Sequence, residues 1–218
     1  MDLFSRSWAA LRSAVAGLAP ADHAADSGCA GWLVRDLVCH LVIDAQDVLI
    51  TLATPADAPP TADAAGYWQP QEQAPDGEDP LAALTVRLAA AYQDPALLAF
   101  HLDDVGSAAG RAAVLADPDA LVSTQDMVLC VRDYLGAYVL EWTLHHLDLV
   151  ARLPHVAGPD APSLAAARAL LERIAGTPFP AALDDPAALL TGTGRRPPTP
   201  EEAALLAAEG TRFPLLLG

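Results

Sequence analysis

The stretch that decides the fold is EWTLHHLDLV, residues 141–150, in the middle of a segment (133–153) that is apolar around nearly its whole circumference. A helix that is apolar all round is normally buried on most sides, as in a helical bundle. Glu141, His145 and Asp148 interrupt this pattern at spacings of four and three residues. Such spacings align side chains on one helix face, so the sequence predicts a buried helix with one polar stripe.

A second strongly apolar segment, WLVRDLVCHLVIDAQDVLITL (32–52), is compatible with a helix and ends at the prolines of TPADAPP. It carries His40 among leucines. Taken singly, a histidine there is explained as a hydrogen-bonded core residue, and a Glu–His pair four residues apart as an ordinary surface pair. Two such anomalies on two apolar helices instead favour a shared site.

His40, Glu141 and His145 are therefore candidate ligands of one divalent metal ion. Groups four residues apart project toward one point, and two histidines with one glutamate leave open positions on Zn²⁺ or a similar ion. Asp44 and Asp148 lie one turn after the two histidines, where they either accept hydrogen bonds from the imidazoles or are simply solvated acids. The neighbouring His146 points about 100° away and is not expected at the same ion.

The rest of the chain has weaker patterns. Helical spacing predicts helices over 3–18, 80–92, 163–175 and 200–208, and residues 120–131 contain a short extended segment. Residues 103–120 resemble a loop, and the proline-rich stretch 54–79 is either a loop that covers a site or a plain connector. We therefore expect a mainly helical, all-α protein.

Charge and composition exclude several function classes. The chain has 218 residues and a formal net charge of −16, and all 12 of its basic residues are arginine. A protein without a basic patch is not expected to bind nucleic acid, and a chain without lysine cannot form a lysine Schiff base.

The cysteines and the hydropathy pattern bear on the cellular compartment. Cys29, Cys39 and Cys130 show no C-x-x-C spacing, so we interpret them as small apolar residues of a reduced protein. There is no apolar run of about 18 residues, and the first residues lack the layout of a signal peptide. We expect a cytoplasmic protein with no membrane segment.

Two motifs together resemble a known family. GWLVRDLVCHL (31–41) and EWTLHHLDL (141–149) are similar to the N-terminal domain family of mycothiol-dependent maleylpyruvate isomerase, within the DinB-like metalloenzyme superfamily. The resemblance extends over roughly residues 5–153. It implies a DinB-like four-helix bundle over residues 1–153 whose metal is held by His40, Glu141 and His145, followed by a helical extension over 154–218 that packs on the bundle.

The C-terminal part departs from that family. In the isomerase itself a further domain of mixed structure helps to bind substrate, whereas residues 154–218 here are few and mostly helical, so maleylpyruvate is not implied as the substrate. The tail LTGTGRRPPTPEEAALLAAEGTRFPLLLG resembles the ending of related uncharacterised proteins. Arg195 and Arg196 in its Gly-Arg turn either hold the carboxylate of a bound molecule or form a flexible basic loop.

The leading hypothesis is a metal-dependent enzyme. It would activate a low-molecular-weight thiol, mycothiol, for transfer to, or isomerisation of, a small electrophilic substrate, with Zn²⁺ as the expected ion and Ni²⁺, Mn²⁺ or Fe²⁺ as alternatives. Three other readings stay open: a hydrolase that activates water, a non-catalytic metal-binding or stress-response module, and a metal-free helical interaction protein. The last predicts that His40 and Glu141 point apart.

Overall fold

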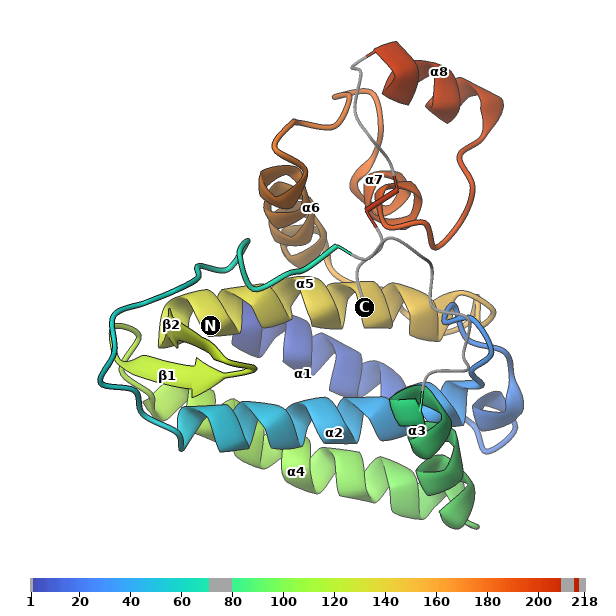
Figure 1. Cartoon of the computed structure of the whole chain (residues 1–218). Coiled ribbons are helices and arrows are strands. Elements are labelled where there is room, and N and C mark those ends of the chain that lie inside the picture. The colour runs from blue at the N-terminus through green and yellow to red at the C-terminus, as the bar shows by residue number, and fades with distance from the viewer. Residues whose placement is uncertain (1, 71–79, 209–213, 216–218) are drawn as a thin grey trace.

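A computed structural model describes residues 2–70, 80–208 and 214–215. Within these residues the protein is mainly helical, which confirms the all-α prediction (Figure 1). The elements are α1 (Leu3–Ala16), a 3₁₀ turn (Asp22–Ala24), α2 (Val34–Leu52), α3 (Pro80–Ala91), α4 (Pro95–Leu115), β1 (Leu121–Thr124), β2 (Met127–Cys130), α5 (Val131–Val150), α6 (Ala161–Ala175), α7 (Asp185–Gly192) and α8 (Pro200–Ala208). None of the helices searched in the described part of the chain is both long and apolar enough to span a membrane.

Four long helices, α1, α2, α4 and α5, lie side by side as a bundle (Figure 1). α4 packs on α1 and α2, while α5 packs on α1 and α2 from the other side. The indoles of Trp8 and Trp142 stack in the core with their centroids 3.9 Å apart, and both side chains are buried. Stacked aromatic pairs contribute about 0.5–1.5 kcal/mol beyond the area they bury, so this contact fixes α1 against α5.

Helix α4 corrects the prediction of a loop at 103–120, because Pro95–Leu115 is helical. Asp94 caps the helix by accepting a hydrogen bond from the backbone N–H of Ala96. The segment contains Gly106, and glycine disfavours a helix by about 1 kcal/mol, so the segment resembles a loop. Close packing requires a glycine at this position, because a Cβ on Gly106 would lie 2.6 Å from the ring of Trp8. The Trp8 indole N–H donates to the Gly106 carbonyl at 2.8 Å, so close packing offsets the low propensity.

The extended segment predicted within 120–131 is confirmed as an antiparallel hairpin of β1 and β2. Gln125 and Asp126 form its two-residue turn with positive φ angles of 47° and 62°, as type I′ hairpin turns require. The described residues of the predicted loop, 54–70, run along this hairpin through backbone hydrogen bonds such as Thr61 N–H to the Val128 carbonyl. Residues 71–79 of the same loop lie outside the described residues.

Helices α6 and α7 cover the outer side of α5 (Figure 1). Leu140, Leu144 and Leu147 of α5 form a second core with α6 and α7. The predicted helices at 163–175 and 200–208 are confirmed, whereas α7 was missed although Asp184 caps it by accepting from the Ala187 N–H. A domain boundary at residue 153 stays a prediction.

Candidate metal centre

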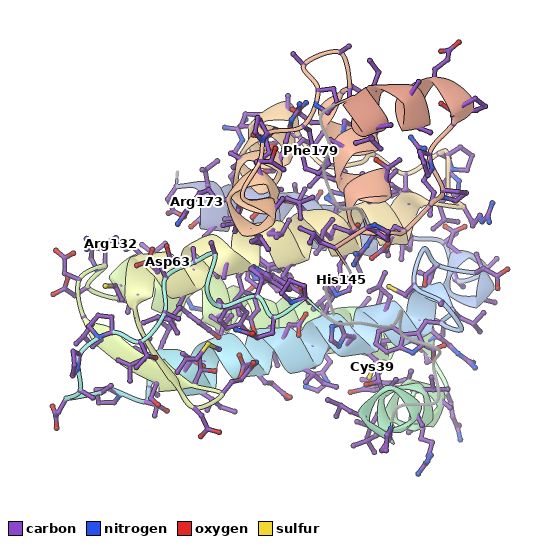
Figure 2. All side chains as sticks on the ribbon, turned by 45° about the horizontal axis from the view of Figure 1, so that its top comes forward. Cys39, Asp63, Arg132, His145, Arg173 and Phe179 are labelled. Atoms are coloured by element: carbon purple, nitrogen blue, oxygen red, sulfur yellow. The ribbon has the colours of Figure 1, made fainter. Side chains whose placement is uncertain are left out.

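Helices α2 and α5 bring four potential ligands to one point. The Nε2 of His145 lies 2.9 Å from Oε1 of Glu141, and the Nε2 of His40 lies 3.7 Å from the same oxygen. Asp44 joins them with its Oδ2 3.5 Å from Nε2 of His40, and all four ligand atoms lie within 4.8 Å of one another. Figure 2 shows His145 between α5 and α2. His40 and Glu141 therefore face each other, contrary to the prediction of the metal-free reading.

The donor set fits a divalent ion. Bonds of about 2.0–2.2 Å place neighbouring ligand atoms roughly 3.0–3.5 Å apart, and the separations at this site lie close to that range. The Oδ2 of Asp44 is buried without a hydrogen-bond partner. No arginine in the described part of the chain forms an ion pair with Asp44 or Glu141. Two carboxylates meet two imidazoles there without an arginine, an arrangement whose negative charge a metal ion would balance.

The site is partly open to solvent. The side chain of His145 is only 7% exposed, whereas those of His40 and Glu141 are 25% and 20% exposed. The indole of Trp32 stands edge-on to the ring of His40, with the centroids 5.2 Å apart. The exposed edge of the site is therefore formed by His40 and Glu141, while His145 forms its buried wall.

Burial and mutual charge shift the pKa values of these groups. Burial alone would lower the pKa of His145, but the charge of Glu141 and the hydrogen bond with Asp148 raise it well above its ordinary value. Burial would raise the pKa of Glu141, yet the charge of His145 holds it below the usual range. For Asp44 burial dominates and raises the pKa to about 6. Without a metal, the site therefore retains a proton on His145 that a bound ion must displace.

Behind His145 lies a buried ion pair. The Nδ1 of His145 is 3.2 Å from Oδ2 of Asp148, a carboxylate whose side chain is 1% exposed. The Nε–H of Arg195 donates to both oxygens of Asp148 at 3.1 and 3.0 Å. Burial would raise the pKa of Asp148, but Arg195 and His145 lower it. The carboxylate is therefore held ionised against the imidazole.

The two arginines of the Gly-Arg turn have partners within the chain. Arg195 pairs with Asp148, and the guanidinium of Arg196 donates two hydrogen bonds of 2.7 Å to the carboxylate of Glu202. A role for either arginine in binding a substrate or cofactor stays a prediction. His146 points away from the ligand cluster, as predicted: its Nε2 lies 2.9 Å from the carbonyl oxygen of Ala157.

Cys29 was missed by the sequence analysis. Its thiol donates to Oδ2 of Asp148 at 3.3 Å, and its Sγ lies 3.8 Å from Nδ1 of His145. Gly28 permits this approach, because a Cβ there would lie 2.7 Å from the Cα of Asp148. Cys29, His145 and Asp148 form a second group within metal-binding distance. Burial raises the pKa of the Cys29 thiol, and Arg195 already neutralises Asp148, so the His40 group is the better candidate.

A polar cluster next to the ligands was also missed. The hydroxyls of Tyr134 and Tyr138 both donate to Oδ2 of Asp47, at 2.8 and 2.7 Å. The ring of Tyr67, from the segment after α2, lies 6.1 and 6.3 Å from those two rings by centroid distance. The sequence signal for this polar cluster is the position of Asp47, one turn after Asp44 on α2.

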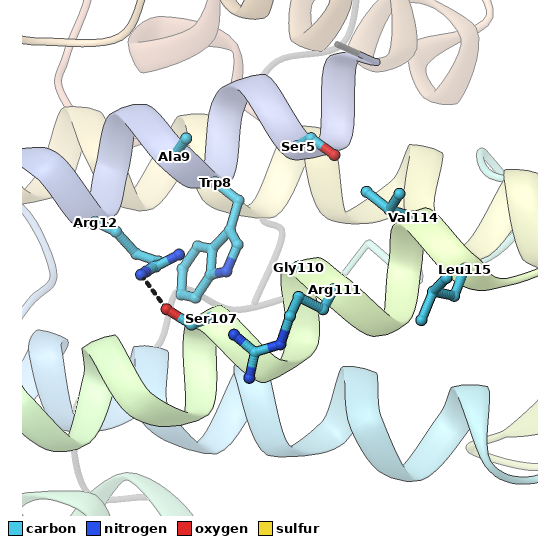
Figure 3. A pocket seen from close by; sticks show the side chains of 9 residues that line it. All are labelled: Ser5, Trp8, Ala9, Arg12, Ser107, Gly110, Arg111, Val114 and Leu115. Atoms are coloured by element: carbon cyan, nitrogen blue, oxygen red, sulfur yellow. Dashed lines mark hydrogen bonds between the residues drawn. The ribbon is translucent and has the colours of Figure 1, made fainter.

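A separate cavity of about 560 Å³ lies between α1 and α4 (Figure 3). Arg12 donates to the hydroxyl of Ser107 at its wall, at 2.5 Å. Its lining residues are Ser5, Trp8, Ala9, Arg12, Ser107, Gly110, Arg111, Val114 and Leu115. None of them belongs to the ligand cluster, so the cavity is not an entrance to that site.

A comparison with known protein families gives one match. The family model described as the mycothiol maleylpyruvate isomerase N-terminal domain matches residues 4–150, which include all four residues of the cluster. No curated protein and no solved structure shows significant similarity to the chain.

Proposed function

The chain belongs to the family of the mycothiol maleylpyruvate isomerase N-terminal domain, and we propose that it is a metal-dependent enzyme that activates a low-molecular-weight thiol. The thiol would be mycothiol, and the reaction its transfer to a small electrophile or the isomerisation of that electrophile. The observation that carries the proposal is the convergence of His40, Glu141 and His145 from two helices on one partly open point.

In this proposal His40, Glu141 and His145 hold a divalent ion, with Zn²⁺ the first expectation. A bound divalent ion favours the thiolate form of a thiol at neutral pH, whereas a free thiol with a pKa of about 8.5 is mostly protonated. The protein's own task is then to hold the ligands in the required protonation states. Imidazoles must present a lone pair, and the glutamate must be ionised.

Asp148 sets the protonation state of His145. Its carboxylate faces Nδ1, so the ring keeps a proton on that nitrogen and presents the lone pair of Nε2 to the ligand cluster. Arg195 keeps Asp148 ionised, and the thiol of Cys29 adds a further hydrogen bond. Arg195 acts through Asp148 and is therefore a positioning residue.

The substrate is proposed as a chemical class that is broader than the compound in the family name. Thiol chemistry is supported by the family, and the open side beside His40 and Trp32 supports access for a small molecule. The residues after 150 lie outside the family match, and their described part includes helices α6, α7 and α8. We therefore propose a small electrophile as the substrate and do not assign maleylpyruvate itself.

Thiol consumption tests this proposal. Protein loaded with Zn²⁺, Mn²⁺, Fe²⁺ or Ni²⁺ would be mixed with mycothiol and either maleylpyruvate or a reactive haloalkane, with glutathione as a second thiol and nitrophenyl acetate as a probe of hydrolysis. Turnover that needs mycothiol and disappears in His145→Ala is expected. Ester hydrolysis without thiol would favour the hydrolase reading. Stoichiometric metal without turnover on any probe would favour the non-catalytic module.

A further inference from the structure

Building on the proposed function, we infer that Asp44 is a fourth protein ligand of the same ion. A thiol bound at this centre would then be at least the fifth ligand of the ion. This differs from a centre of two histidines and one glutamate. The inference rests on which atoms of the side chains face one another.

The two helices contribute matching pairs. α2 presents His40 and Asp44, and α5 presents Glu141 and His145, each an imidazole and a carboxylate four residues apart. Side chains at that spacing lie on one face of a helix, one turn apart. Because α2 and α5 face each other here, the two pairs meet at one point, with all four ligand atoms within 4.8 Å.

Asp44 does not lie where a supporting hydrogen-bond acceptor must lie. Such an acceptor contacts the nitrogen of an imidazole that does not bind the metal, as Asp148 does at Nδ1 of His145. Asp44 instead faces Nε2 of His40, the same atom that lies 3.7 Å from Glu141. One nitrogen cannot offer its lone pair to an ion and also donate a hydrogen to Asp44, so the predicted supporting role is incompatible with ligation through Nε2.

Within the described residues, the ion-pair partner of the Asp44 carboxylate is His40, itself a candidate ligand. The Oδ2 of Asp44 is buried without a hydrogen-bond partner, and the side chain is only 12% exposed. Asp47, one turn further along α2, receives hydrogen bonds from the hydroxyls of Tyr134 and Tyr138. A buried carboxylate oxygen without a donor is unfavourable unless a cation balances it, and the ligand cluster supplies the place for one.

The fourth ligand changes the character of the centre. Two imidazole nitrogens and two carboxylate oxygens, with no sulfur, suit Zn²⁺, Fe²⁺, Mn²⁺ or Ni²⁺ and disfavour soft monovalent copper. Two carboxylates also neutralise the charge of a divalent ion. A thiol would then be a fifth ligand, which suits ions that can bind five or six ligands.

The matched variants Asp44→Ala and Asp47→Ala test the inference. Each removes one carboxylate from neighbouring turns of α2, so the loss of negative charge near the ion is similar. Asp44→Ala would also remove a ligand, whereas Asp47→Ala removes the acceptor of two tyrosine hydroxyls. Zn²⁺ affinity would be measured by competition with a chromophoric chelator, and coordination by the visible absorption of the Co²⁺-loaded proteins. Circular dichroism would establish that each variant retains its helices.

We expect Asp44→Ala to bind Zn²⁺ more than about 100-fold more weakly than wild type, beyond the effect typical of supporting residues. Its Co²⁺ spectrum should change, and added acetate should restore it by filling the vacated position. Asp47→Ala should keep the wild-type Co²⁺ spectrum. A wild-type Co²⁺ spectrum for Asp44→Ala overturns the inference, whatever its affinity.

The failure of this inference is distinguishable from the failure of the proposed function. If wild type binds a divalent ion and His145→Ala does not, while Asp44→Ala keeps the wild-type Co²⁺ spectrum, only the role of Asp44 is overturned. If wild type binds none of the four ions, both are overturned.

Discussion

Replacement of Arg195 by methionine tests the buried ion pair that supports His145. Methionine keeps much of the length and apolar bulk of the side chain but removes the charge. Arg195 and Asp148 are 12% and 1% exposed, so the pair is largely screened from water. The variant would leave the Asp148 carboxylate buried with only His145 and Cys29 as partners.

The expected destabilisation is about 3 kcal/mol, at the lower end of the 3–5 kcal/mol typical for breaking a buried pair, because two hydrogen-bond partners remain. For a chain of this size that corresponds to a decrease in Tm of about 6–12 °C. Both values would be measured on metal-free protein, by denaturant titration and thermal scans, so that metal binding does not contribute.

Arg173→Met is the matched control. Arg173 donates to Asp63 at 2.7 Å, a shorter contact than that of Arg195, but both side chains are 54% exposed and the two residues lie at the surface (Figure 2). An exposed pair contributes less than about 1 kcal/mol. If Arg195→Met is no more destabilising than Arg173→Met, the reasoning from burial is refuted.

The pH dependence has a defined sign. The pKa of Asp148 is lowered in the folded protein, so its contribution to stability is present above the ordinary carboxyl range and is lost as the pH falls. The difference between wild type and Arg195→Met should therefore be largest at neutral pH and decrease below about pH 4. In the double variant Arg195→Met/Asp148→Asn, which contains neither charge, part of the lost stability should return.

Three further predictions concern other parts of the structure. Gly28→Ala would place a Cβ 2.7 Å from the Cα of Asp148 and should destabilise the protein by about 1–3 kcal/mol in denaturant titrations; a neutral effect would contradict the close approach. Metal affinity should rise between pH 6 and pH 8 in chelator competition, because the pKa of His145 is raised and its proton must leave, and a flat profile would count against ligation by His145. Hydrogen bonds from Arg196 lower the pKa of Glu202 to about 2, so the stability difference between wild type and Glu202→Gln should be present above pH 4.5 and disappear as the pH falls toward 2, which thermal scans would show.

The sequence was most informative where apolar side chains dominate. The segments 32–52 and 133–153 were predicted as strongly apolar helices, the second of them buried, and α2 and α5 occupy most of both ranges. Polar side chains on such helices are conspicuous, so His40, Glu141 and His145 could be selected and then found together. The register within each helix follows from helical geometry, which explains why the spacing of four residues was informative.

Other features depend on contacts between distant segments. Cys29 and Arg195 reach Asp148 from 119 and 47 residues away in the chain, and no local pattern encodes such contacts. Helix α4 was missed because Gly106 and its small neighbours resemble a loop, although tertiary packing against Trp8 stabilises the helix. The direction in which Asp44 faces His40 likewise depends on the packing of α2 against α5.

The most direct test of the central claim is the metal content of purified protein, by elemental analysis without chelators, for wild type, His145→Ala and His146→Gln. His146 is the neighbouring histidine and faces the carbonyl of Ala157, so its variant is a control for changes in α5 that spare the ligand cluster. The account predicts about one divalent ion per chain in wild type and in His146→Gln, and none in His145→Ala with helix content retained. Wild-type protein that holds no ion after incubation with zinc, nickel, manganese or iron, or a His145→Ala variant that keeps full occupancy, would contradict it.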